Sequence, residues 1–151
     1  MDASSDRIER SIHFRAARDR VWRAVSDAPE FGRWFGVDLE GKRFVVGEAI
    51  EGRITHPGYE HVPWRVQVEL IEPPHRLAFL WHPYAIEPGV DYASEPPTRV
   101  EFTLSDDDGG TLLTVVESGF DRVPAHRRDE AFRMNAQGWS AQMDNIARHV
   151  G

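Results

Sequence analysis

The sequence predicts an α+β fold in which a curved antiparallel sheet of about seven strands holds one long C-terminal helix. From Pro124 to Val150, apolar residues recur at steps of four and three, which gathers them on one helical face. Between residues 37 and 118, short runs alternate apolar and polar side chains and are separated by turn residues. Such runs are typical of consecutive antiparallel strands.

The chain is expected to open with one strand followed by two short helices. Apolar and polar residues alternate from Ile8 to Phe14, which is the period of a half-buried strand. Helical spacing follows over roughly residues 17–26. After Ser26-Asp27, a second short helical segment begins at Pro29 and ends near Trp34-Phe35.

The middle of the chain is expected to form the rest of the sheet. Strands are predicted at residues 37–39, with Phe44–Val46 as a continuation, and at 49–55, 64–70, 77–81, 100–104 and 111–118. The run Asp106-Asp107-Asp108-Gly109-Gly110 is expected to form a hairpin loop. Strands joined by successive hairpins are antiparallel neighbours.

Residues 83–97, here called the proline-rich loop, do not fit this strand pattern. The segment contains four prolines, with Tyr84, Ile86, Val90 and Tyr92 between them. It is too rich in proline for a strand and too apolar for a flexible linker. Two interpretations remain open: a lid over a binding site, or a loop that packs on its own aromatic side chains over the sheet edge.

Length and composition limit the classes of protein to consider. The 151 residues fit one domain, 1–151, and the net charge of −7 argues against nucleic-acid and anionic-membrane surfaces. The absence of cysteine excludes disulfides and thiol nucleophiles. No run has the length of a membrane span, and the acidic N-terminus lacks the apolar stretch of a signal peptide, so we expect a cytoplasmic protein.

No metal site or cofactor is expected. His56 and His61 lie in an expected loop, and their spacing matches no ligand motif. The Asp106–Asp108 run lacks the later glutamate of a calcium loop. The sequence also contains no Ser-His-Asp pattern, phosphate-binding glycine loop or nicotinamide fingerprint.

Three polar residues are candidates for a role inside a pocket. Arg10 and Glu117 lie in phase with apolar neighbours, so they form either an inward ion pair on paired strands or a solvent-exposed pair at the strand ends. His82 follows a predicted strand at the start of the proline-rich loop. It is either a general acid or base, or a hydrogen-bond partner of a loop carbonyl.

A strongly curved sheet rarely closes fully around a helix, so we expect a cavity between the two layers. On the helix, Asn135 and Gln142 flank Trp139 and either present amides to a ligand or mark the edge of the apolar face. The residues expected to line this cavity are mainly apolar, and Asn135 is the polar member: Trp34, Phe35, Phe79, Trp81, Tyr84, Phe102, Asn135, Trp139 and Met143. Arg10, His82 and Glu117 are the expected polar anchors.

Several short motifs extend over nearly the whole chain in a characteristic order. They are Val21-Trp22-Arg23-Ala24-Val25-Ser26-Asp27, Trp34-Phe35, Pro73-Pro74-His75-Arg76-Leu77, Phe79-Leu80-Trp81, Val100-Glu101-Phe102, Gly110-Thr111-Leu112-Leu113-Thr114-Val115, Ser118-Gly119-Phe120 and Gly138-Trp139. Together they resemble the START/Bet v allergen-like (SRPBCC) superfamily, and most closely bacterial homologues of the activator of the heat-shock protein 90 ATPase. The resemblance implies a single domain with a helix-grip fold.

This superfamily includes lipid carriers, polyketide cyclases, hormone receptors and chaperone regulators, so the resemblance leaves the activity open. The leading hypothesis is non-catalytic binding of a small hydrophobic or aromatic ligand between the sheet and the C-terminal helix. The alternatives are an enzyme of the polyketide cyclase or aromatase kind, and an interaction protein that modulates a chaperone ATPase or another protein partner. The chain is expected to act as a monomer or a homodimer.

Overall fold

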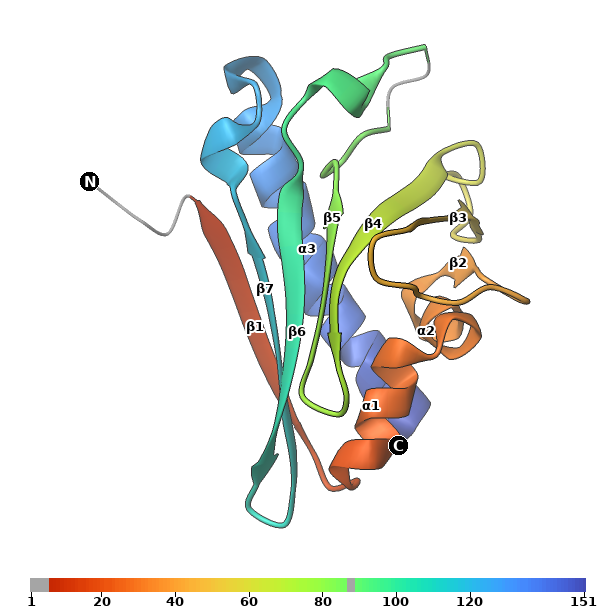
Figure 1. Cartoon of the computed structure of the whole chain (residues 1–151). Coiled ribbons are helices and arrows are strands. Elements are labelled where there is room, and N and C mark those ends of the chain that lie inside the picture. Colours follow the sequence, from red (N-terminus) through yellow and green to blue (C-terminus); the bar gives the residue numbers. More distant parts are fainter. Residues whose placement is uncertain (1–5, 87–88) are drawn as a thin grey trace.

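The computed structural model describes residues 6–86 and 89–151 (Figure 1). Met1–Ser5 and residues 87–88 of the proline-rich loop lie outside the described part. One seven-stranded sheet has the order β1-β7-β6-β5-β4-β3-β2, and all neighbouring strands are antiparallel. The strands are β1 (Arg7–Phe14), β2 (Val37–Asp38), β3 (Ala49–Ile54), β4 (Pro63–Glu72), β5 (Arg76–Trp81), β6 (Thr98–Asp107) and β7 (Gly110–Ser118).

Three α-helices accompany the sheet: α1 (Arg18–Ser26), α2 (Ala28–Phe35) and α3 (Ala125–Val150). Short 3-10 turns occur at Tyr92–Ser94 (η2) and Phe120–Arg122 (η3). In Figure 1, α3 runs behind the sheet, from the end that carries the β5–β6 loop to the end that carries α1 and α2. The predicted α+β helix-grip architecture is therefore confirmed.

The long helix forms where the apolar repeat predicts it. At 26 residues it is about 39 Å long, enough to cross the sheet. Trp139, Met143 and Ile146 are buried, as the repeat requires, and Ala131 adds a fourth buried position. Pro124 is the N-cap residue, so α3 begins at Ala125, one residue later than the Pro124–Val150 run predicts. Among the described residues, no helix has both the length and the apolar composition needed to cross a membrane.

One strand prediction was wrong. Phe44–Val46 has no strand conformation and does not extend β2. The Phe44 ring instead packs from a loop against Phe31, with ring centroids 5.5 Å apart, while Val46 is 53% exposed. Phe44 is apolar because it anchors a loop on the core. A short apolar run does not distinguish such a loop from a strand.

Aromatic side chains fill most of the space between the sheet and the helices. Phe31 of α2 is fully buried at the centre and meets Trp34, Phe79 and Phe102 edge to face, with centroids 4.8, 6.4 and 6.1 Å away. Such contacts add to the free energy gained by burying the rings. The core is therefore packed with aromatic rings where α2 meets the sheet.

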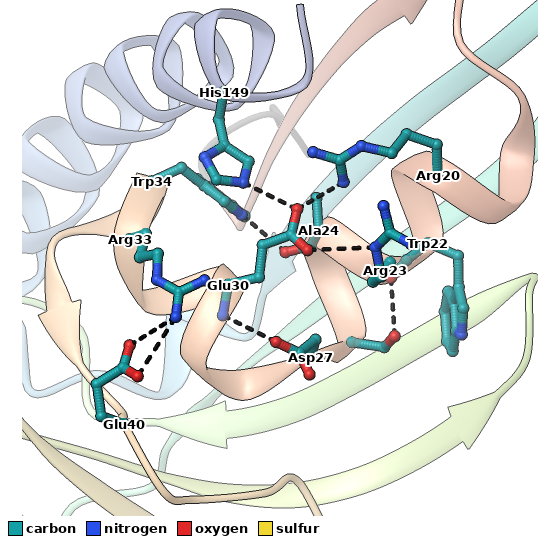
Figure 2. Close-up of polar contacts among 11 residues, drawn as sticks. Arg20, Trp22, Arg23, Ala24, Asp27, Glu30, Arg33, Trp34, Glu40 and His149 are labelled. Atoms are coloured by element: carbon teal, nitrogen blue, oxygen red, sulfur yellow. Dashed lines mark hydrogen bonds and ion pairs between the residues drawn. The ribbon is translucent and has the colours of Figure 1, made fainter.

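Glu30 of α2 connects the three helices at the C-terminal end of α3, as Figure 2 shows. Its carboxylate accepts hydrogen bonds from Arg20 (2.5 Å) and His149 (2.8 Å), and the Arg23 guanidinium lies 3.5 Å away. Burial alone raises the pKa of Glu30, but the hydrogen bonds and charges of Arg20 and His149 outweigh it and hold the pKa below its usual value. The C-terminal end of α3 is thus tied to α1 and α2.

Candidate ligand-binding site

An open groove of about 850 Å³ runs alongside α3. We refer to it as the groove. The end of α2, the β3–β4 loop and the proline-rich loop form its other walls. Many of its lining residues are apolar or aromatic: Trp34, Phe35, Ile54, Tyr59, Trp64, Tyr84, Ile86, Met134, Gly138 and Ala141. Polar and charged side chains line it as well: Arg33, Thr55, His56, Gln142, Asn145, Arg148 and His149.

Two smaller spaces adjoin the groove. The first, here called the loop pocket, measures about 390 Å³ and lies under the proline-rich loop, where Tyr84 and Ile86 line both it and the groove. The second, here called the niche, measures about 150 Å³ and shares Trp81 and Asn135 with the loop pocket. The three spaces therefore adjoin one another along α3.

Aromatic rings build the wall of the niche. Phe35 lies 6.0 Å from both Trp81 and Trp139, measured between ring centroids. The indole rings of Trp81 and Trp139 are 5.8 Å apart and stack at 30°. The three rings come from α2, β5 and α3, so the niche exists only in the assembled fold.

Glu117 lies behind the niche as a fully enclosed carboxylate. Its Oε2 accepts hydrogen bonds from Thr98 Oγ1 (2.5 Å) and Trp81 Nε1 (2.7 Å). Its Oε1 accepts from Trp139 Nε1 (2.8 Å) and Asn135 Nδ2 (2.9 Å). In the described part of the chain, no basic side chain forms an ion pair with it within 4.0 Å. Neutral donors therefore compensate for the desolvation of this carboxylate.

The sequence brings these donors to Glu117 through two regular spacings. Asn135 and Trp139 are four residues apart on α3 and so share one helical face. Trp81 and Thr98 are direct partners across β5 and β6. Glu117 lies opposite Val100 on the neighbouring strand, in the row of inward side chains that also contains Thr98. The network therefore joins three strands to the helix.

Gly138 leaves open space on the face of α3 that borders both the groove and the niche. A Cβ atom built at this position meets no other atom within 4 Å. Glycine inside a helix costs about 1 kcal/mol relative to alanine. Packing therefore does not require a glycine here, and the space beside it remains open.

The proline-rich loop is attached to the first turn of α3 by Arg127. The guanidinium donates to both oxygens of Glu95, with the shortest contact at 2.6 Å, and to the carbonyl oxygen of Pro83 at 2.7 Å. It also lies 4.8 Å from the centroid of the Tyr92 ring. Both charged side chains are almost buried, at 12% and 14% exposure. The loop is therefore held over the loop pocket by a shielded ion pair.

The structure brings most of the predicted lining residues to this site and places a few in the core. Trp34, Phe35, Trp81, His82, Tyr84, Asn135 and Trp139 line the groove, the loop pocket or the niche. Phe79, Phe102 and Met143 are buried in the hydrophobic core. Trp34 also supports the fold, because its Nε1 donates to the Ala24 carbonyl oxygen at 2.8 Å.

The inward ion pair between Arg10 and Glu117 is not formed in the described structure. Arg10 lies opposite Val115 on β7, whereas Glu117 lies opposite Ile8. The Arg10 guanidinium reaches α3 instead and donates to Ser140 Oγ at 3.0 Å and to the Ala136 carbonyl oxygen at 3.2 Å. Arg10 therefore fastens the edge strand to the helix, outside the niche.

His82 forms a hydrogen bond with a loop carbonyl group, as the second of the two interpretations predicts. Its Nε2 lies 2.9 Å from the carbonyl oxygen of Glu95, across the base of the proline-rich loop. The ring also lines the loop pocket. In the described ranges, no three His, Asp or Glu side chains come together in a group that could hold a metal ion.

Sequence reasoning missed four residues of this site. Thr98 is in phase with Val100 and Phe102, so its inward position could have been found from the strand period. The Arg127–Glu95 pair joins a helix to an irregular loop, and no period predicts such a contact. Gly138 was noted only as part of a motif, although a mid-helix glycine is itself a signal of a packing or functional requirement.

Comparison with known proteins agrees with this architecture. Residues 15–151 match the family described as "Activator of Hsp90 ATPase homolog 1-like protein". No curated protein matches the sequence at a significant level.

Solved structures also share the fold. DynU16, from the dynemicin biosynthetic locus, is 26% identical with a TM-score of 0.69, and the match covers 95% of this chain but only 46% of DynU16. CalU16 from Micromonospora echinospora is 22% identical with a TM-score of 0.67, over 96% of this chain and 76% of CalU16. The Aha1 dimer from Colwellia psychrerythraea is 14% identical with a TM-score of 0.68, over 93% of this chain and 92% of that one.

The family match extends over nearly the whole chain, and the structural matches show the same helix-grip arrangement. These findings agree with the resemblance seen in the sequence motifs. The chain belongs to the family of activator of Hsp90 ATPase homolog 1-like proteins, within the SRPBCC superfamily.

Proposed function

We propose that this protein binds a small apolar or aromatic ligand in the groove beside α3, without catalysing a reaction. The observation that carries this proposal is the groove itself, about 850 Å³ in volume and lined by aromatic and aliphatic side chains with polar and charged side chains among them. Ligand sites in proteins have volumes of roughly 300–1,000 Å³, apolar walls and a few placed polar groups. The niche and the loop pocket supply those polar groups through Asn135 and His82.

The surroundings of the groove support the same proposal. Tyr59 and Val90, which are 36% and 52% exposed, line the groove and the loop pocket respectively. Apolar side chains at the rim suit the transfer of an apolar molecule from water. DynU16, which shares the fold, comes from a biosynthetic locus, and this fits a role that involves a small molecule.

Catalysis of the cyclase kind is supported less well by the geometry. That alternative needs His82, Glu117 or Arg10 to point into a cavity, within hydrogen-bond reach of one another or of a bound substrate. Glu117 is enclosed by its own donors, and Arg10 is bonded to the backbone and side chains of α3. His82 alone remains at the pocket wall, and one such group fits a binding role better than a reaction.

A protein partner, such as a chaperone, is the second candidate function. The family description favours it, and the Aha1 dimer gives a precedent for assembly within this fold. A role of this kind does not require space inside the protein. A substitution that fills the groove should therefore weaken ligand binding but leave binding of a protein partner intact.

Substitution of Gly138 by phenylalanine is expected to weaken ligand binding at least about tenfold, because the ring would occupy the open space beside α3. Binding of 2-naphthol and 2-methylnaphthalene would be measured by isothermal titration calorimetry. The variant should fold as well as the wild type, since almost any residue is a better helix former than glycine.

Gln137→Phe is the matched control, because Gln137 is the preceding residue on α3, is exposed and does not line the groove. It should leave both affinities unchanged. The proposal fails if the wild-type protein binds neither compound, or if Gly138→Phe binds them as tightly as the wild type.

A further inference from the structure

We infer that the ligand carries a hydroxyl group on an aromatic ring, and that this hydroxyl donates a hydrogen bond to Oδ1 of Asn135 in the niche. The inference rests on the proposed function and specifies its ligand class. Asn135 lies on α3, at the junction of the niche and the loop pocket.

Glu117 fixes the direction of the Asn135 amide. Asn135 Nδ2 lies 2.9 and 3.2 Å from the two carboxylate oxygens. Each of these oxygens also accepts an indole N–H, from Trp139 or Trp81, and an indole N–H is a donor only. Both oxygens of the Glu117 carboxylate therefore act as acceptors, and the Asn135 amide must direct its donor group, the NH₂, towards Glu117. Its carbonyl oxygen then points away from Glu117.

Oδ1 of Asn135 is the only side-chain oxygen or nitrogen of the niche that has no hydrogen-bond partner among the described residues. The N–H groups of Trp81 and Trp139 are both bonded to Glu117. Gln142 donates from Nε2 to the Phe35 carbonyl oxygen at 2.8 Å and accepts at Oε1 from Asn145 at 3.0 Å. Oδ1 is also not among the fully enclosed unpaired atoms, so part of its surface is accessible.

The loop pocket presents a second acceptor. His82 Nε2 lies 2.9 Å from the Glu95 carbonyl oxygen, which can only accept, so Nε2 carries the hydrogen. In the neutral ring, Nδ1 is then an acceptor. Among the N–H donors that line this pocket, Arg65 bonds through Nε to Glu51, and the Trp64 indole N–H is fully enclosed.

The size and walls of the niche suit one aromatic ring. A dry cavity of about 150 Å³ is large enough for benzene, and the niche has about this volume. Phe35, Trp81 and Trp139 offer ring faces or edges on its sides. An acceptor beside an aromatic wall selects a ring that carries a donor, which is the chemistry of a phenol.

The test compares three naphthalenes by calorimetry on the wild-type protein and on Asn135→Leu. 2-Naphthol has the donor, 2-methylnaphthalene has a methyl group of similar size, and 2-methoxynaphthalene keeps the oxygen without its hydrogen. In the wild type, 2-naphthol should bind more tightly than 2-methoxynaphthalene. The affinity ratio of 2-naphthol to 2-methylnaphthalene should fall about tenfold in Asn135→Leu, since only the hydroxyl loses a partner.

The ratio of two affinities is not changed by a variant that is merely less stable, so it reports on the hydrogen bond. Equal ratios in the two proteins, or tighter binding of the methoxy compound by the wild type, would overturn the inference while leaving the proposed binding function intact. Failure of all three compounds to bind would overturn both. If Asn135→Leu does not fold, the order of the three affinities on the wild-type protein decides the question.

Discussion

Replacing Glu117 with leucine is expected to lower the free energy of unfolding by about 3–5 kcal/mol, which is a large part of the stability of a small domain. The substitution leaves the donors of Thr98, Trp81, Trp139 and Asn135 without their acceptor inside the protein. Each enclosed donor without a partner costs about 1–3 kcal/mol, and removal of the desolvated carboxylate offsets part of the total. Urea unfolding followed by circular dichroism measures the loss.

Two further variants make this result specific. Glu117→Gln keeps the shape but turns an NH₂ group towards one indole N–H, so it should cost less than leucine but still about 2 kcal/mol. Glu9→Leu, on the exposed face of the neighbouring strand, should change stability by about 0.5 kcal/mol at most. Wild-type stability in Glu117→Leu would show that the donors rearrange, and would remove the buried network from this account.

Replacing Arg127 with alanine is expected to release the proline-rich loop and to speed amide exchange within it about a hundredfold. Loss of the guanidinium leaves the Glu95 carboxylate almost buried without its partner, and also removes the contacts with Tyr92 and the Pro83 carbonyl oxygen. Breaking a buried ion pair costs about 3–5 kcal/mol, and about 2.8 kcal/mol suffices for a hundredfold change in the opening equilibrium. Hydrogen exchange of the amides of Ala93 and Glu95 reports on this opening.

Arg128→Ala is the control for this variant, since Arg128 is the next residue on α3 and donates to the Val123 carbonyl oxygen rather than to the loop. Its loop amides should exchange at the wild-type rate. Exchange in the β6 and β7 strands should be unchanged in both variants, because the ion pair holds a loop and not the sheet. Unaltered loop exchange in Arg127→Ala would mean that packing alone holds the loop on the helix.

The fold was largely predictable because burial imposes periods on the sequence. The steps of four and three that end at Val150 mark the helix face that packs on the sheet, and the alternation from Trp64 to Leu70 marks β4. Phe44 shows the limit of this reasoning, because a loop residue can be as apolar and as buried as a strand residue. Where a segment has no helical or strand repeat, its own sequence does not predict its conformation.

The candidate site was only partly predictable for the same reason. Trp81, Asn135 and Trp139 could be identified as a cluster from their places on one strand face and one helix face. The partner of Glu117 was expected to be Arg10, because both residues are in phase on strands that pair. The alternation along a strand shows which face of the sheet a side chain occupies, but not which residue lies opposite it on the next strand. Arg10 lies opposite Val115 rather than Glu117, and neutral donors bind the Glu117 carboxylate.

The most direct test of the account is a ¹H–¹⁵N spectrum of the five indole N–H groups during titration with 2-naphthol. These signals belong to Trp22, Trp34, Trp64, Trp81 and Trp139, and single Trp→Phe variants would assign them. Binding in the niche predicts the largest shifts for Trp81 and Trp139, whose rings form its wall, and little change for Trp22, which lies outside the site. A saturating titration that leaves Trp81 and Trp139 unmoved would contradict the account.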